Sequence, residues 1–100
     1  MNVSEMILQT IGTGEENAVN ADFLTKLTGL TVRELRQTVE TLRRDGHVIL
    51  SSNSGYFYPA TAAELERHIK KESRRARSIF YTLRSARELL KKWTDGSGSE

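Results

Sequence analysis

Arginine and glutamine side chains recur at helical spacing between residues 31 and 45. On the predicted helix, the residues on the outer face or its flank are Arg33, Arg36, Gln37 and Arg44. A guanidinium can donate two hydrogen bonds to guanine, and a glutamine amide can pair in the same bidentate way with adenine. This pattern therefore predicts a helix face that reads base edges in the major groove of DNA.

Uncharged polar side chains around these residues could hold the DNA backbone. They are Thr31 and Thr41 on the helix, with Ser52 and Asn53 at the tip of a predicted hairpin. Hydroxyl and amide groups commonly bind phosphate oxygens and so fix the register of a protein on the duplex. The hairpin tip carries no basic residue, which makes its contribution the weaker part of this prediction.

A solvated helix face is the alternative interpretation of the same residues. Arginines are common on exposed helices, and Glu34, Glu40 and Asp45 would repel phosphate or pair with the arginines. The sequence leaves both interpretations open and favours contact with DNA.

A helix-turn-helix pattern positions the predicted DNA-contacting face. Asn20 is expected to cap a helix over 21–28 whose inner side carries Phe23, Leu24 and Leu27, and Gly29 ends it. In the next helix Thr31 and Glu34 form a capping box. The apolar seam of that helix consists of Val32, Leu35, Val39 and Leu42, and Asp45-Gly46 ends it.

Short elements are predicted on both sides of this pattern. Ser4 is expected to cap an N-terminal helix, and Ala18-Val19 could form a stub strand. Residues 47–51 and 56–58 are rich in β-branched and aromatic side chains and surround a turn, which predicts a hairpin.

The order of helix, stub strand, helix-turn-helix and hairpin over about residues 3–59 resembles the winged-helix family. The turn Leu-Thr-Gly-Leu-Thr at 27–31, the helix Val-Arg-Glu-Leu-Arg-Gln-Thr-Val-Glu-Thr-Leu-Arg-Arg-Asp-Gly at 32–46 and the wing ending Gly55-Tyr56 are similar to winged helices of the biotin-repressor type. The whole is also similar to small winged-helix proteins of Gram-positive bacteria and their prophages. The resemblance implies an α+β, mostly helical fold that binds double-stranded DNA. It also implies a transcriptional regulator or a phage or prophage accessory protein.

A long basic helix over 61–94 follows, opened by a capping box of Thr61 and Glu64. Its seam has alternating spacings of three and four residues and is predicted to mediate dimerisation. The seam residues are Leu65, Ile69, Ala76, Ile79, Leu83, Ala86 and Leu90. The seam could instead fold back onto residues 1–60, and a dimer could be parallel or antiparallel.

The positive charge of the chain is concentrated in this helix. Residues 1–60 carry a net charge of −2, residues 61–93 carry +6, and the whole chain carries +2. Lys70, Arg74 and Arg77 lie away from the seam and could neutralise phosphates in a salt-dependent way, although a merely solvated face is equally compatible.

Composition excludes other classes of function. The chain has no cysteine and two separated histidines, with no nucleophile motif or phosphate-binding glycine loop. We expect no enzyme activity, metal, cofactor or membrane contact, a cytoplasmic location, and a flexible tail at 95–100. The alternative function is a protein-docking module that uses the winged helix and the long helix as its surface.

Overall fold

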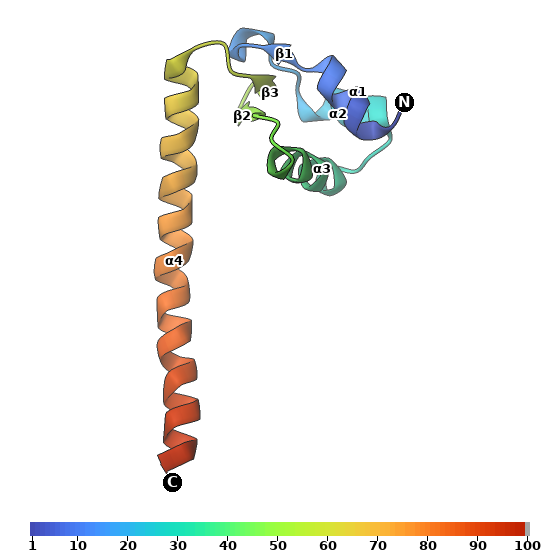
Figure 1. The fold of residues 1–100 in the computed structure, drawn as a ribbon. Helices are drawn as coiled ribbons and strands as arrows, with labels where there is room; N and C mark the ends of the chain where they lie inside the picture. The colour runs from blue at the N-terminus through green and yellow to red at the C-terminus, as the bar shows by residue number, and fades with distance from the viewer. Residues whose placement is uncertain (100) are drawn as a thin grey trace. The chain divides into compact units, whose positions relative to one another are not determined.

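A computed structural model describes the backbone of residues 1–99 and the side chains through Asp95 (Figure 1). The fold is α+β and mostly helical, with a small sheet and a long C-terminal helix. Its elements are α1 (Val3–Thr10), β1 (Gly12–Thr13), the 3-10 turn η1 (Glu15–Asn17), α2 (Ala21–Thr28), α3 (Val32–Arg44), β2 (Leu50–Ser52), β3 (Gly55–Tyr58) and α4 (Ala62–Ser99). The chain divides into two units, residues 1–68 and residues from 69 onward.

Side-chain caps determine where the first two helices begin. The amide oxygen of Asn2 accepts a hydrogen bond from the Glu5 backbone N–H at 2.9 Å, so Asn2 and not Ser4 caps α1. The prediction of Ser4 as the cap was wrong. Asparagine caps a helix as well as serine does, and the backbone of Asn2 has the extended conformation of a capping residue, whereas Ser4 already lies within α1. Asn20 caps α2 as predicted, accepting from the Phe23 N–H at 2.8 Å.

A short turn joins α2 to α3. Gly29 ends α2 in the left-handed conformation, with φ of 78°, and its N–H bonds the Thr25 carbonyl. Thr31 and Glu34 form both bonds of the predicted capping box, so α3 begins immediately after the turn. The predicted bounds of α2 and the predicted start of α3 are therefore confirmed, and α3 ends at Arg44, one residue before the predicted end.

The sheet is three-stranded, in the order β1-β3-β2. The hairpin is confirmed, but β2 covers only Leu50–Ser52, where Leu50 is opposite Phe57 and Ser52 is opposite Gly55. The stub strand β1 lies at Gly12–Thr13 and runs parallel to β3. The predicted stub at Ala18-Val19 is reduced to an isolated antiparallel bridge between Val19 and Tyr56.

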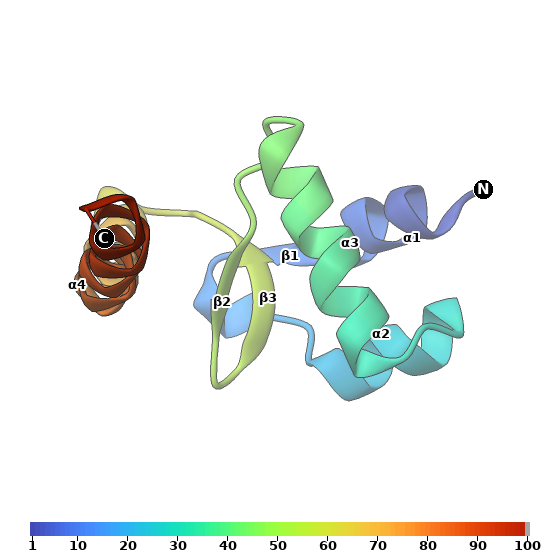
Figure 2. The same cartoon turned by 90° about the horizontal axis from the view of Figure 1, so that it is seen from below.

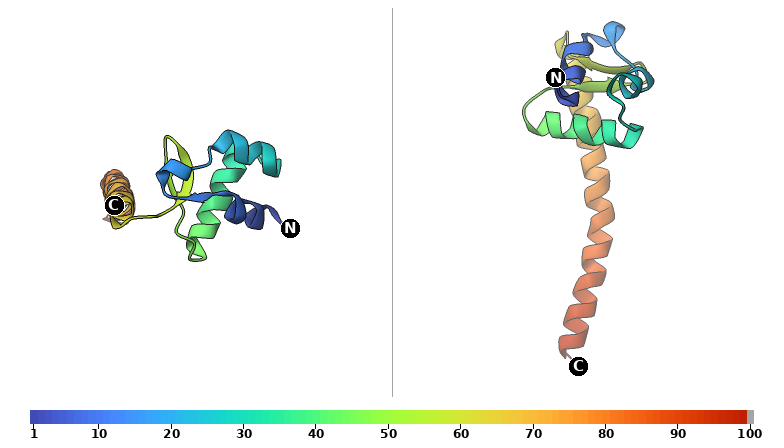
Figure 3. Two further views of the ribbon diagram at one scale, coloured as in Figure 1. Left: turned by 90° about the horizontal axis from the view of Figure 1, so that it is seen from above. Right: turned by 90° about the vertical axis from the view of Figure 1, so that its right-hand side faces the viewer.

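The core of residues 1–68 lies where α1, α2 and α3 gather on one side of the sheet (Figures 2 and 3). Its fully or almost fully buried side chains are Ile7, Ile11, Leu24, Leu35, Val39, Leu42, Ile49, Leu50 and Phe57. Phe23, Leu27 and Val32, which the helical spacing placed inside, are instead half exposed. Short helices bury only a narrow stripe, and in α2 Leu24 alone fills it.

The first turn of α4 is fixed to the rest of residues 1–68 through one carboxylate. Glu64 accepts from the backbone N–H groups of Ala60 and Glu15, at 2.7 and 2.8 Å, while its own N–H donates to the Thr61 hydroxyl at 3.1 Å. These bonds favour the ionised form and lower the pKa of Glu64, with the Ala60 N–H the largest cause. Their contribution to stability is present above the unfolded-state pKa and is lost as pH falls through the lowered folded-state value.

α4 continues through Ser99, beyond the end predicted at residue 94. Glu100, the last residue of the predicted tail, lies outside the described residues. Within residues 1–99, no helix is both long and apolar enough to cross a membrane.

Replacing Gly55 with alanine is expected to unfold residues 1–68 at markedly lower urea. A Cβ at this position would lie 2.3 Å from the Val19 carbonyl oxygen, and the glycine φ is +124°. We expect a loss of about 3 kcal/mol in the free energy of unfolding, from backbone strain and the broken Val19–Tyr56 bridge. Gly46→Ala is the matched control, because φ is +104° there but nothing lies within 4 Å of the added Cβ. Equal losses in the two variants would contradict the close-approach argument.

Candidate nucleic-acid interface

The outer face of α3 carries the residues predicted to contact DNA. Leu35, Val39 and Leu42 are buried on the inner side. The exposed residues are Thr31 at the cap and Arg33, Arg36, Gln37, Thr41 and Arg44 along the helix. Because the inner stripe fixes the rotation of α3, the remaining side chains are presented together to solvent over about three turns.

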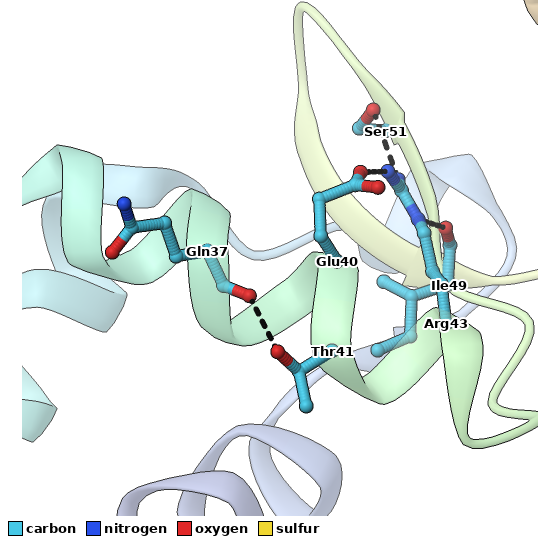
Figure 4. Close-up of polar contacts among 6 residues, drawn as sticks. All are labelled: Gln37, Glu40, Thr41, Arg43, Ile49 and Ser51. Atoms are coloured by element: carbon cyan, nitrogen blue, oxygen red, sulfur yellow. Dashed lines mark hydrogen bonds and ion pairs between the residues drawn. The ribbon is translucent and has the colours of Figure 1, made fainter.

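The basic side chains on this face are not used inside the protein. Among the described residues, Arg33, Arg36 and Arg44 make no side-chain hydrogen bond or ion pair. The Gln37 side chain is also without one, although its carbonyl accepts a bond (Figure 4). These donors can therefore bind an external acceptor without breaking a hydrogen bond or ion pair among the described residues.

Two acidic residues of α3 that could oppose DNA have internal partners. The Glu34 carboxylate accepts from the Thr31 N–H at 2.9 Å, and this bond, with the Thr31 hydroxyl, lowers the pKa of Glu34. The Glu40 carboxylate lies 2.6 Å from the Arg43 guanidinium. Each is held by a neighbour on its own helix or cap, and Glu40 is partly neutralised.

Arg43 is a positioning residue that the sequence analysis did not single out. Its Nε donates to the Ile49 carbonyl at 2.8 Å, Nη1 to Glu40 at 2.6 Å and Nη2 to the Ser51 hydroxyl at 3.4 Å (Figure 4). It thereby fixes the C-terminal turn of α3 to the start of the hairpin. The sequence signal for this role is its position four residues after the buried Val39, which places Arg43 beside the apolar seam of α3.

The hydroxyls of the two predicted threonine contacts both have partners within the protein. Thr41 donates its hydroxyl hydrogen to the Gln37 carbonyl at 3.1 Å, so it would have to break that bond to donate to a phosphate. The Thr31 hydroxyl accepts from the Glu34 N–H at 3.1 Å and also interacts with the Glu34 carboxylate, as the lowered pKa of Glu34 reflects. Contact with a phosphate would therefore compete with an existing interaction at both threonines.

The hairpin tip presents polar groups without charge. Ser52 Oγ accepts from the Ser54 N–H at 3.1 Å, which shapes the turn and leaves the Ser52 hydroxyl hydrogen to donate. Asn53 is exposed beside it. Both residues belong to the same unit as α3, whereas the remaining predicted contacts do not.

Lys70, Arg74 and Arg77 lie on α4 in the second unit and are exposed. Their spacings of four and three residues place them on successive turns of one helix face. They make no side-chain ion pair or hydrogen bond among the described residues. They form a separate basic surface.

The predicted seam of α4 is exposed to solvent. Ile79 and Leu90 are 52% and 60% exposed, Ile69 and Leu83 are about half exposed, and Leu65 is the most covered. Ala76 and Ala86 are exposed as well. Phe80, Tyr81 and Trp93 extend the apolar surface, and the Arg87 guanidinium lies 5.6 Å from the centre of the Phe80 ring. Contiguous exposed apolar surface of this kind is typical of an interaction site.

Among the described residues, no group of three or more histidine, cysteine, aspartate or glutamate side chains could hold a metal ion. Comparison of the chain with family models, curated proteins and solved structures finds no match.

Proposed function

We propose that this protein is a winged-helix protein that binds double-stranded DNA, with α3 in the major groove. The observation that carries the proposal is the outer face of α3, where Arg33, Arg36 and Gln37 are exposed near the helix start without side-chain partners. Side chains at the start of a recognition helix are those that reach base edges. Thr31 supplies a phosphate contact at the same end.

The arrangement of elements supports the winged-helix interpretation. α2 and α3 form a helix-turn-helix joined by Gly29–Thr31, and the β2–β3 hairpin follows α3 directly. β3 lies between β2 and the stub β1, so the hairpin is anchored to the sheet and its tip at Ser52 and Asn53 is free to contact the DNA backbone.

In this proposal α4 joins two copies of the chain and adds phosphate contacts. The exposed seam needs an apolar partner, and a second α4 offers a surface of matching length. Lys70, Arg74 and Arg77 lie off the seam and would contact phosphates. A dimer with two recognition helices fits a transcriptional regulator or a phage or prophage accessory protein.

Fluorescence anisotropy of a labelled random-sequence duplex across a salt series tests the proposal. Affinity is expected to fall steeply with salt, because each phosphate neutralised adds about 0.9 to the slope of log affinity against log salt. Arg33→Glu combined with Arg36→Glu should abolish binding, while Lys26→Glu, on α2 and paired to Asp22, should change it little. Absence of binding at low salt would overturn the proposal.

A protein-docking module is the second candidate, favoured by the exposed apolar seam of α4 and by the net charge of −2 over residues 1–60. In that case the α3 substitutions would leave the function unchanged, and seam substitutions alone would abolish it.

A further inference from the structure

We infer that two α4 helices pair antiparallel, in the register that places Leu65 opposite Leu90 of the second copy. The inference rests on the dimer in the proposed function and specifies its orientation and register, which the spacing of the seam leaves open. It follows from which side chains meet in each possible pairing.

A parallel, in-register pair would place identical side chains opposite one another. Glu72 falls at a seam position between Ile69 and Ala76, so two glutamates would face each other in the interface. Two like charges in a partly desolvated interface repel and carry a desolvation cost. Ala76, Ala86 and Trp93 would also face their own copies. The paired alanines would leave unfilled space, and the paired tryptophans would be crowded.

The antiparallel register places large side chains opposite small ones. Ile69 then faces Ala86, Ala76 faces Ile79, and Trp93 faces Ala62 of the second copy. Leu65 faces Leu90, and Glu72 faces Leu83 and no longer its own copy. The same spacing extends the seam by one position at each end, to Ala62 and Trp93. In this register every position of the extended seam has an opposite position, whereas a shift by one heptad leaves large residues at one end without any. Packing of large against small residues keeps a constant distance between helix axes.

Residues flanking the seam agree with this register. Glu66 and Arg87 lie on the same edge of the seam, at positions that face each other across an antiparallel pair, and each is repeated by symmetry. On the same edge, Phe80 faces Ser73, whose small side chain leaves room for the ring. In the parallel pair Arg87 would face Thr82 and gain no opposite charge.

The orientation determines where the two DNA-binding units attach. Ala62 of the two copies would lie about 47 Å apart along the pair, from 31 residues at a rise of 1.5 Å each. A parallel pair would bring these attachment points to about 10 Å, the distance between packed helices. The inference thus predicts that the attachment points are separated by more than one turn of B-DNA, which is about 34 Å.

Cysteine cross-linking tests the orientation, and the absence of native cysteine makes the result unambiguous. Leu65→Cys and Leu90→Cys variants are oxidised separately and as an equimolar mixture, and products are read by mass. Antiparallel pairing predicts that the mixed disulfide is the main product and that each variant alone stays at least tenfold less cross-linked. The second pair, Ile69→Cys with Ala86→Cys, gives the same test if a terminal variant folds poorly.

Self-cross-linking of each variant alone would show a parallel pair and overturn the inference. No cross-link in either mixture, with a monomer in sedimentation, would overturn it too. DNA binding measured by anisotropy on the unmodified protein is a separate readout, so failure of the α4 pairing and failure of the DNA-binding proposal are distinguishable.

Discussion

Replacing Leu83 with aspartate is expected to convert the dimer into monomers at micromolar concentration. Leu83 lies in the middle of the seam and is about half exposed in the single chain, so the proposed pairing buries it. Each dimer contains two such positions, and losing about 1.5–3 kcal/mol of apolar burial at each raises the dissociation constant roughly a hundredfold to ten-thousandfold. In the antiparallel register the new carboxylate also faces Glu72, which adds repulsion.

Sedimentation equilibrium over a concentration series measures this change. Ser85→Asp is the matched control: it adds the same charge two residues away on α4, off the seam, and should leave the dimer intact. A monomer for the unmodified protein at every concentration would contradict the proposed pairing of two α4 helices.

Local sequence signals sufficed for the parts of the fold that short-range chemistry determines. Asn20, Gly29, Thr31 and Glu34 each act through hydrogen bonds or dihedral angles within a few residues, so the bounds of α2 and the start of α3 follow from the sequence alone. The exposed face of α3 was predicted in the same way, because the helical spacing of Leu35, Val39 and Leu42 defines the opposite, buried face.

Features that depend on long-range contacts were not predictable in the same way. The parallel strand β1 exists because Gly12 meets Phe57, 45 residues away, and no local pattern marks it. Arg43 was not singled out from the sequence, yet its guanidinium bonds Glu40 on its own helix and the Ile49 carbonyl before the hairpin. Glu64 was predicted only to cap its own helix, but its carboxylate also accepts from the Glu15 N–H, which is far away in the sequence. In each case the contact depends on tertiary packing that brings the partner close in space.

The α3 face yields the prediction that separates base reading from simple charge attraction. Replacing Arg33 and Gln37 with alanine should reduce affinity for a preferred site far more than affinity for random DNA. Each bidentate contact with a base contributes about 1–3 kcal/mol of discrimination, so the double variant should lose roughly 2–6 kcal/mol of specificity. The salt slope should change by less than about one unit, because only one positive charge is removed.

The measurement is a pair of anisotropy titrations, on a duplex selected for tight binding and on a scrambled duplex, each over a salt series.

Lys70→Ala combined with Arg74→Ala is the informative comparison, since these α4 residues are proposed to touch phosphate alone. That variant should weaken binding to both duplexes equally and lower the salt slope by about two. Equal loss on both duplexes for the Arg33 and Gln37 variant would instead assign those side chains to the phosphate backbone. Arg33 and Gln37 make no side-chain hydrogen bond or ion pair within the described residues, so neither substitution breaks one. A change in specificity would therefore report on the DNA interface itself.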